Sequence, residues 1–391
     1  MAMASLRIGV DNISCGDATG RQGPGGMREY VSQMILGFHA RRPDYKIIVF
    51  TPAWADPLVE STDGIHAIVL RGVPRSKLLR AAYQQTVLPW VAGLQELDVF
   101  FATSTVAPLA IRAPVVLAVQ FLQFYEQPEG YGFLRRRYLR ALLPLSVRKA
   151  KRTITFTNAA ARDLVRHVGM DETRLRIVAH GLSDALRTAS RQHHGDEGAA
   201  FRQLITGGRP YIVYVSATYG YKNHLTLIRA FAEAKRLASL PHVLVLVGSE
   251  VTVAFDDLRR QAAAVGIRDS LVITGRVEDP GVYYRHADLA VMPSLYETFG
   301  FTALEPMLFE CPVVASCFGS VAELAGDSAL LVDPRNTHDL ATGIVRVLGD
   351  PILRQQLISR GVARAEGYTW CRCAAETLAV IEDAAKTKQI R

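Results

Sequence analysis

Short apolar runs rich in β-branched residues alternate with helical patterns in both halves of the chain, and this alternation limits the fold more than any other feature. Each run is bounded by turn-forming residues, which is typical of a buried strand. The runs lie at 6–10, 46–50, 67–70, 99–102, 114–119, 153–158, 211–215, 243–249, 271–277, 287–293 and 312–316. Strands that alternate with helices predict parallel sheets covered by helices. The sequence therefore predicts an α/β fold whose pattern restarts near residue 211.

Chain length and composition favour two globular domains. The 391 residues exceed what one hydrophobic core usually supports. A content of 49% hydrophobic and 21% charged residues is ordinary for a soluble protein. No apolar run approaches the length of a membrane span, and the chain enters a strand at 6–10 instead of the apolar core of a signal peptide. We therefore expect a cytoplasmic protein.

The cysteines and paired histidines give no metal or redox pattern. Exposed linker residues are the better interpretation of His193 and His194, since no third ligand is suggested nearby. The spacings of the five cysteines match no zinc or redox motif, so we expect reduced thiols at Cys15, Cys311, Cys317, Cys371 and Cys373.

A formal net charge of +8 and a pI near 9.3 indicate an anionic partner, which could be a nucleotide, a nucleic acid or an acidic membrane. Eight basic residues and no acidic residue lie in the segment 135–152, mixed with apolar residues. Two interpretations of this segment are equally good, a contact with an anionic membrane surface or a solvated helix packed on the first domain. Nucleic-acid binding is disfavoured, because no binding motif or aromatic platform accompanies the charges.

The stretch 294–307 follows the apolar run 287–293 and places two carboxylates near a strand end. Ligands of α/β proteins bind at the carboxyl ends of strands. Gly300 allows a ligand to approach the backbone because it has no Cβ. Glu297 and Glu305 supply acceptors for a ligand rich in hydroxyls, such as a sugar or a ribose. Either carboxylate alone is better explained as a solvated loop acid or as an acid that complements a helix dipole.

Two other stretches could meet a phosphate. Gly25 and Gly26 precede a helical pattern over 27–38, and the amides of such a loop can bind an anion; a flexible turn is an equally good interpretation. Lys222 stands at a later strand-to-helix junction, where its charge would neutralise a phosphate. As an isolated residue it would be interpreted as an exposed lysine at a helix start.

Taken together, these stretches resemble the family-4 retaining glycosyltransferases, also known as glycosyl transferases group 1. That family commonly carries Pro-Ser, then Glu-x-Phe-Gly and Leu-Glu-Ala-Met. This chain has Pro293-Ser294, Glu297-Thr298-Phe299-Gly300 and Leu304-Glu305-Pro306-Met307. Lys222-Asn223 is similar to the family's Lys-Asn/Gly pair, although the arginine that many members carry a few residues earlier is absent.

One position departs from the family pattern. Many members carry a histidine after the strand that corresponds to 114–119, and this chain has Gln120 there. Glutamine donates and accepts hydrogen bonds but does not titrate, so any role for Gln120 must be in positioning and not in proton transfer.

The resemblance implies a GT-B fold, in which two Rossmann-like, doubly wound domains face each other across a deep cleft. It places an acceptor-binding domain at 1–184 and a domain that binds the nucleotide sugar at 209–366, and the polar composition between them predicts a linker at 185–208. A C-terminal helix at 367–391 is expected to cross back to the first domain.

The resemblance also assigns roles to residues. Glu305 is expected to bind the ribose, Glu297 the donor sugar and Lys222 the leaving diphosphate. The expected catalytic residues are Glu297, Lys222 and Gln120. The expected donor-binding residues are Glu305, Phe299, Gly300, Phe301, Thr302, Gly25, Gly26, Gly248, Arg276 and Val277. Neither a metal nor a cofactor is expected, because the lysine and helix amides would carry the charge and no Asp-x-Asp motif is present.

The implied reaction transfers a mannose-, rhamnose- or glucose-like hexose from a GDP- or UDP-sugar to a glycan or lipid-linked acceptor, in the synthesis of a bacterial cell-surface polysaccharide. The implied partners are the nucleotide sugar, the acceptor and an anionic membrane surface at 135–152, with no nucleic acid. No nucleophilic carboxylate is identified, so we favour front-face attack with retention at the anomeric carbon. A non-catalytic protein that binds nucleotide sugars and a sugar-nucleotide epimerase of the same architecture are the alternatives.

Overall fold

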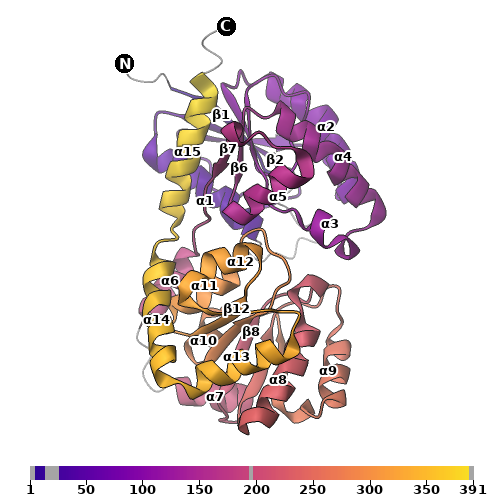
Figure 1. The fold of residues 1–391 in the computed structure, drawn as a ribbon. Helices are drawn as coiled ribbons and strands as arrows, with labels where there is room; N and C mark the ends of the chain where they lie inside the picture. Colours follow the sequence, from indigo (N-terminus) through magenta and orange to yellow (C-terminus); the bar gives the residue numbers. More distant parts are fainter. Residues whose placement is uncertain (1–4, 14–25, 193–196, 387–391) are drawn as a thin grey trace. The chain divides into compact units, whose positions relative to one another are not determined.

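The computed structural model describes residues 5–13, 26–192 and 197–386, and the chain forms two compact units. The first unit comprises Met1–Gly181 and Trp370–Arg391, and the second comprises Leu182–Thr369 (Figure 1). Each unit has its own parallel sheet with buried apolar strands. This arrangement confirms the α/β fold predicted from the alternating pattern.

The sheet of the first unit has seven parallel strands in the order β3-β2-β1-β4-β5-β6-β7. The strands are β1 (Arg7–Asp11), β2 (Lys46–Pro52), β3 (Ile65–Leu70), β4 (Val99–Ala102), β5 (Val115–Ala118), β6 (Arg152–Thr155) and β7 (Leu175–Ile177). Successive strands extend one way from β1 and the other way from β4. The strand order therefore reverses between β1 and β4, and open α/β sheets bind ligands outside the carboxyl ends of such a pair.

Helices cover this sheet. They are α1 (Gly26–Arg41), α2 (Lys77–Gly93), α3 (Gln123–Glu126), η1 (Pro128–Gly130), α4 (Phe133–Lys149), α5 (Asn158–Val168), η2 (Glu172–Arg174) and α15 (Trp370–Lys386). The C-terminal helix α15 packs against α1, although more than 300 residues separate them in sequence (Figure 1). Gly37 makes this contact tight, because a Cβ at that position would lie 2.4 Å from the Cβ of Ala374.

The sheet of the second unit has six parallel strands in the order β10-β9-β8-β11-β12-β13. They are β8 (Tyr211–Val215), β9 (Val243–Val247), β10 (Leu271–Gly275), β11 (Leu289–Met292), β12 (Val313–Ser316) and β13 (Leu330–Val332). The order reverses between β8 and β11. The helices that follow β8 are η3 (Gly220–Lys222), α8 (His224–Ala238), α9 (Phe255–Ala264), η4 (Arg268–Ser270), α10 (Gly281–Arg285), α11 (Phe301–Leu308), α12 (Gly319–Ala325), η5 (Gly326–Ser328), α13 (Thr337–Gly349) and α14 (Pro351–Glu366).

The segment 185–208, expected to be a linker, instead carries helices that pack on the second unit. It contains most of α6 (Asp184–Arg191) and all of α7 (Glu197–Thr206). Arg187 donates to the carbonyl of Ala365 at 2.9 Å, and Arg202 donates to the carbonyl of His286 at 3.0 Å. Both arginines donate to backbone carbonyls that are distant in sequence. The polar composition of the segment does not reveal such contacts. His193 and His194 lie outside the described residues.

Two further expectations can be compared with the structure. Within the residues that the structure describes, no helix is both long enough and apolar enough to cross a bilayer. The four described cysteines are free thiols, at Cys311, Cys317, Cys371 and Cys373, and Cys15 lies outside the described residues.

Candidate active site

In the second unit, two loops meet where the strand order reverses. One loop follows β8 and contains Lys222, and the other follows β11 and contains Glu297. The amide of Leu295 donates to the carbonyl of Tyr221 at 2.8 Å and joins the two loops. Lys222 Nζ lies 2.5 Å from Glu297 Oε1, and these side chains are only 16% and 8% exposed. The two residues predicted from separate motifs therefore form one buried ion pair.

Asn223 holds the lysine in place. Its backbone adopts the left-handed conformation, with φ of 64°, immediately before α8. Its side-chain amide donates to the carbonyls of Pro293 at 3.1 Å and Pro334 at 2.7 Å, which follow β11 and β13. The hydroxyl of Tyr214 donates to the carbonyl of Lys222 at 3.0 Å. Contacts from three strands thus fix the backbone that carries Lys222.

The ion pair keeps Lys222 charged. Burial, the largest single influence, lowers the pKa of Lys222, but the charge and hydrogen bond of Glu297 together with Tyr214 and Tyr221 outweigh it, and the pKa of Lys222 lies above its ordinary value. The neighbouring His224 behaves in the opposite way, because burial and, to a smaller extent, the charge of Lys222 lower the pKa of His224 to about 4. At neutral pH the site therefore offers a permanent cation beside a carboxylate and a neutral imidazole.

Gly300 caps the start of α11, and its backbone adopts a conformation that favours glycine. Its φ is 119°, and a Cβ there would meet Met292 Cε at 3.4 Å. Phe299 before it is buried and packs against Phe301, with ring centroids 4.9 Å apart. Thr302 Oγ1 is shielded from solvent and makes no hydrogen bond within the described chain. The first turn of α11 can therefore present backbone amides to a ligand.

Glu305 lies further along α11 and is positioned by a tyrosine. The hydroxyl of Tyr284 donates to Glu305 Oε2 at 3.0 Å. Burial, followed by the charge of Glu305, raises the pKa of Tyr284 well above its usual range, so it remains a donor. Nothing in the helical spacing of α10 reveals this hydrogen-bond partner of Tyr284.

Gly248, Arg276 and Val277 lie at the carboxyl edge of the same sheet, after β9 and β10. Gly248 has φ of 147°, and a Cβ there would lie 2.1 Å from the carbonyl oxygen of Ser216, so only glycine fits. Its amide donates to the carbonyl of Gly275 at 2.9 Å. Arg276 is exposed and Val277 is half-buried, and the order of strands places both away from Lys222.

In the first unit, Gln120 follows β5 at the carboxyl edge of the sheet. Its amide nitrogen Nε2 is buried and has no hydrogen-bond partner among residues 5–13, 26–192 and 197–386. This free donor suits the positioning role expected for Gln120. Gly26 begins α1, and Gly25 lies outside the described residues.

A second group of polar side chains lies at the reversal point of the first unit, and no sequence motif predicted it. Asp11 ends β1 and is fully buried. It accepts hydrogen bonds from Gln84 Nε2 at 2.5 Å and from the amide of Ile13 at 2.9 Å. Burial raises the pKa of Asp11, partly offset by these hydrogen bonds. Gln84 comes from the middle of α2, so only the folded structure brings it to Asp11.

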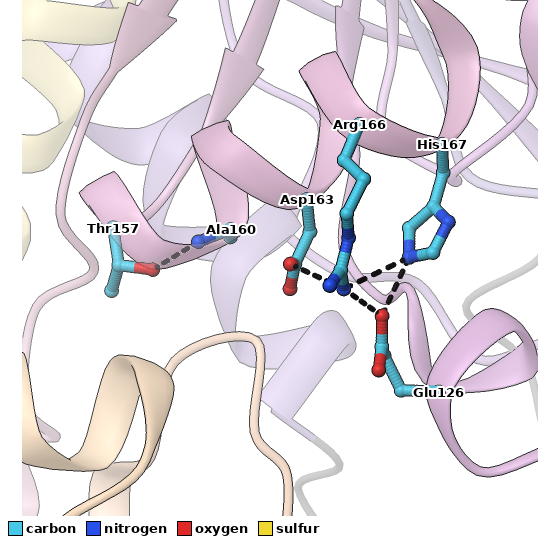
Figure 2. Close-up of polar contacts among 6 residues, drawn as sticks. All are labelled: Glu126, Thr157, Ala160, Asp163, Arg166 and His167. Carbon is cyan, nitrogen blue, oxygen red and sulfur yellow. Dashed lines mark hydrogen bonds and ion pairs between the residues drawn. The ribbon is translucent and has the colours of Figure 1, made fainter.

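Glu126, Asp163 and His167 lie close enough together to suggest a metal site (Figure 2). However, Arg166 Nη2 donates to Asp163 Oδ1 at 3.1 Å and also pairs with Glu126. His167 Nε2 lies 2.6 Å from Glu126 Oε1. The guanidinium already supplies the positive charge that a metal would bring. We interpret the cluster as an ion-pair network that ties α3, just after Gln120, to α5.

Comparison with known proteins identifies both halves of the chain. Residues 24–186 match the model of "Glycosyltransferase Family 4", and residues 197–364 match that of "Glycosyl transferases group 1". The D-inositol 3-phosphate glycosyltransferase of Rhodococcus opacus is 31% identical over 237 residues, which cover 57% of this chain and 51% of that protein. The match thus spans about half the length of that relative.

Solved structures show the same fold. The Anabaena protein HepE, in complex with UDP and glucose, has a TM-score of 0.71 at 20% identity and covers 99% of this chain and 100% of its own. Sucrose-phosphate synthase from Thermosynechococcus elongatus has a TM-score of 0.76 at 20% identity, with coverage of 97% and 98%. Two parallel α/β units together with these likenesses establish the GT-B fold.

Proposed function

The chain belongs to the family-4 glycosyltransferases of the GT-B fold, and we propose that it transfers a hexose from a UDP- or GDP-sugar with retention at the anomeric carbon. The observation that carries this proposal is the buried pair of Lys222 and Glu297 at the reversal point of the second sheet. A cation and an acceptor of hydrogen bonds at this place suit a ligand that contains both a diphosphate and sugar hydroxyls.

We assign Lys222 to the diphosphate. Its charge is permanent at neutral pH and would stabilise the negative charge that develops as the diphosphate leaves. Glu297 and the amides at the start of α11 would hold the sugar hydroxyls, and Glu305 would accept from the ribose. Gly248, Arg276 and Val277 would frame the nucleotide from β9 and β10. No metal is required in this scheme, because lysine and helix amides supply the positive charge.

Retention is assigned to front-face attack. A double displacement needs a carboxylate nucleophile on the face of the sugar opposite the leaving group. In the described part of the second unit, Glu297 is engaged by Lys222 and Glu305 by Tyr284, so neither stands as a free nucleophile. The departing diphosphate would then take the proton of the acceptor hydroxyl. Gln120 would position a ligand through its unpaired amide without transferring a proton.

The acceptor is proposed to be a glycan or a lipid-linked sugar, at the inner face of a membrane, in the synthesis of a cell-surface polysaccharide. Two helices of the first unit support contact with an anionic bilayer. Neither α2 nor α4 contains an acidic residue, and α4 carries most of the basic segment 135–152. Trp90 on α2 and Phe133 on α4 are 69% and 61% exposed. Exposed aromatic residues beside basic ones are typical of a membrane-surface helix.

The proposal is tested by incubating the protein with UDP-glucose, UDP-galactose, GDP-mannose and GDP-fucose and measuring the release of free nucleoside diphosphate. A ligand that binds the folded state also raises the melting temperature, so the same panel identifies the base. We expect one donor to stabilise the protein and to be hydrolysed slowly without acceptor. Stabilisation without hydrolysis or transfer would favour the alternative of a non-catalytic binding protein, and epimerised donor would favour an epimerase.

A further inference from the structure

The second sheet ends at β10, and the outer edge of this strand is open. Strand β10 pairs with β9 on one side, and no described strand lies on its other side. All five residues of β10 are half-buried, whereas the neighbouring β9 is fully buried. The register against β9 shifts between Ile273 and Gly275, so the strand bends there. An open edge presents backbone donors and acceptors that can pair with another strand.

One edge of the first sheet, in contrast, is protected by a side chain. Strand β7 is outermost there, and the guanidinium of Arg176 donates to the carbonyls of Thr173 at 2.9 Å and Leu175 at 2.7 Å. In β10, no side chain of the described residues bonds to the backbone of 271–273. The backbone of β10 therefore remains free to pair along its outer edge.

A groove of about 410 Å³ lies along this edge, between β10 and α9. Four apolar residues line it, two from α9 and two from one face of β10, namely Ala262, Ala263, Leu271 and Ile273. Apolar surface in an exposed groove is typical of an interaction site. The groove and the open edge together therefore offer both apolar and backbone contacts to a partner strand.

The arginines of α9 that also line the groove do not oppose the approach of another chain. Arg259 Nη1 lies 2.9 Å from Asp256 Oδ1, and Arg260 pairs with Asp257. Each arginine thus has a carboxylate one turn earlier on the same helix. The positive charge along α9 is balanced within the helix, so it does not exclude a second copy of this chain.

Charged side chains lie at both ends of β10. Arg268 and Asp269 precede the strand, and Arg276 and Glu278 follow it. All four are exposed, and none of them forms an ion pair within the part of the chain that the structure describes. Arg268 lies five residues before Ile273, and Glu278 lies five residues after it. The two ends therefore carry charges of both signs at matching distances from the middle of the strand.

Antiparallel pairing of β10 with β10 of a second copy would bring opposite charges together. A two-fold axis at Ile273 places residues at equal distances before and after it opposite each other. Arg268 then faces Glu278 of the second copy, and Asp269 lies beside Arg276 of that copy. Each contact occurs twice because the axis repeats it, and opposite charges stabilise paired strands. Since β10 is short and bends, these charged ends would largely fix the register.

We propose that a second copy of this chain docks on β10, so that the two strands pair antiparallel around Ile273 and join their two six-stranded sheets. The second copy would cover the groove and bury Leu271 and Ile273 against their counterparts. A two-fold contact closes on itself, so the expected assembly is a dimer. This inference does not depend on the proposed glycosyl transfer.

The test measures the assembly of the full chain by sedimentation velocity, at concentrations up to the solubility limit. Arg268→Glu and Glu278→Arg each place like charges opposite each other, and the double variant restores opposite charges with their signs exchanged. Ile273→Lys places a charge on the two-fold axis. Arg236→Glu is the matched control, because Arg236 is exposed on α8 and does not line the groove. Melting curves confirm that each variant is folded.

We expect the wild type and the control to form dimers with the same Kd. Each single charge reversal should weaken dimerisation about 10-fold, because two attractive contacts become two repulsive ones. The double variant should recover the affinity of the wild type, and an equimolar mixture of the two single variants should form heterodimers. Ile273→Lys should be a monomer, since a lysine at a strand edge opposes pairing.

The proposal is overturned if the wild type is a monomer at every concentration, which would show that the bend in β10 is enough to protect its edge. It is also overturned if a dimer forms but the charge reversals and Ile273→Lys leave its Kd unchanged, because another surface would then hold the dimer. If the single variants lose affinity that neither the double variant nor the mixture restores, the pairing around Ile273 is wrong.

Discussion

The two sheets have the same topology at their reversal points, but they treat a buried carboxylate in opposite ways. In the second unit, Glu297 lies 2.5 Å from Lys222, whose pKa is raised above its ordinary value. In the first unit, Asp11 is surrounded by neutral donors, Gln84 and Ser104, and its pKa is raised by burial. Topology therefore places a buried carboxylate at both reversal points, whereas its neighbours differ, a cation in the second unit and neutral donors in the first.

This difference agrees with different tasks for the two units. A charged pair provides a fixed cation for a diphosphate and a fixed acceptor for hydroxyls, as proposed for the donor. A carboxylate held by neutral donors fixes the end of its strand. The four predictions below test this comparison, from the largest expected effect to the smallest.

Replacing Lys222 with alanine should have the largest effect. We expect donor hydrolysis and transfer to fall about 100- to 1000-fold, because the leaving diphosphate loses its cation. Stability should also fall by about 3–5 kcal/mol, because Glu297 would remain buried without its partner. Activity is measured per folded molecule, with the fraction folded taken from circular dichroism. The exposed Arg236 on the following helix, α8, gives the control Arg236→Ala, which should keep full activity.

Gly248→Ala tests whether the carboxyl edge of the second sheet tolerates any side chain. The new Cβ would collide with the carbonyl of Ser216, and φ of 147° strains any other residue. We expect a loss of about 3 kcal/mol in the free energy of unfolding, measured with urea. Gly349→Ala is the control, because a Cβ there meets no atom within 4 Å. A stable Gly248→Ala protein would contradict the close approach of β8 and β9.

Acid should destabilise both units through one buried histidine in each. The pKa is lowered to about 3 for His180 in the first unit and to about 4 for His224 in the second, in each case chiefly by burial. The unfolded chain takes up a proton near pH 6.5, so stability is retained above that pH. It should fall by about 1.4 kcal/mol per histidine for each pH unit below it, until the folded pKa is reached.

His180→Phe and His224→Phe should each reduce this acid sensitivity. Urea unfolding at pH 7.5 and at pH 5 measures how much stability each protein loses on acidification. If both variants lose as much stability on acidification as the wild type, the two histidines are not the cause.

Asp11→Asn should have the smallest effect, and its sign should depend on pH. The raised pKa of Asp11 means that the folded state holds this proton more tightly than the unfolded state. The wild type therefore loses stability as pH rises from the unfolded pKa, about 3.9, through the higher folded pKa. The variant lacks this loss, so its stability relative to the wild type should improve between pH 3.5 and pH 7. A difference that is constant with pH would show that Asp11 keeps its ordinary pKa.

The sequence predicted the features that depend on local pattern. The α/β alternation, the helix after Gly26 and the motif around Glu297 and Gly300 depend on residues close together in the chain, and the structure contains each of them. The ion pair was not predicted as a contact, although both of its members were named. Lys222 and Glu297 are 75 residues apart, and only the strand order brings them together.

Other features could not be predicted because they depend on partners distant in sequence. The role of Tyr284 depends on its hydrogen bond to Glu305, and that of Gln84 depends on its hydrogen bond to Asp11. The segment 185–208 has the polar composition of a linker, yet its arginines bind carbonyls of the second unit and stabilise two helices. In each case the decisive interaction is a hydrogen bond across the fold, which neither periodicity nor composition records.

The most direct test of the donor assignment is calorimetric titration of wild type, Lys222→Ala and Glu297→Gln with a nucleoside diphosphate and with the matching nucleotide sugar. We predict that Lys222→Ala weakens binding of both ligands about 10- to 100-fold. Glu297→Gln should leave diphosphate affinity nearly unchanged and remove the additional affinity that the sugar gives. Equal affinities of all three proteins for both ligands would contradict the assignment of Lys222 to the diphosphate and Glu297 to the sugar.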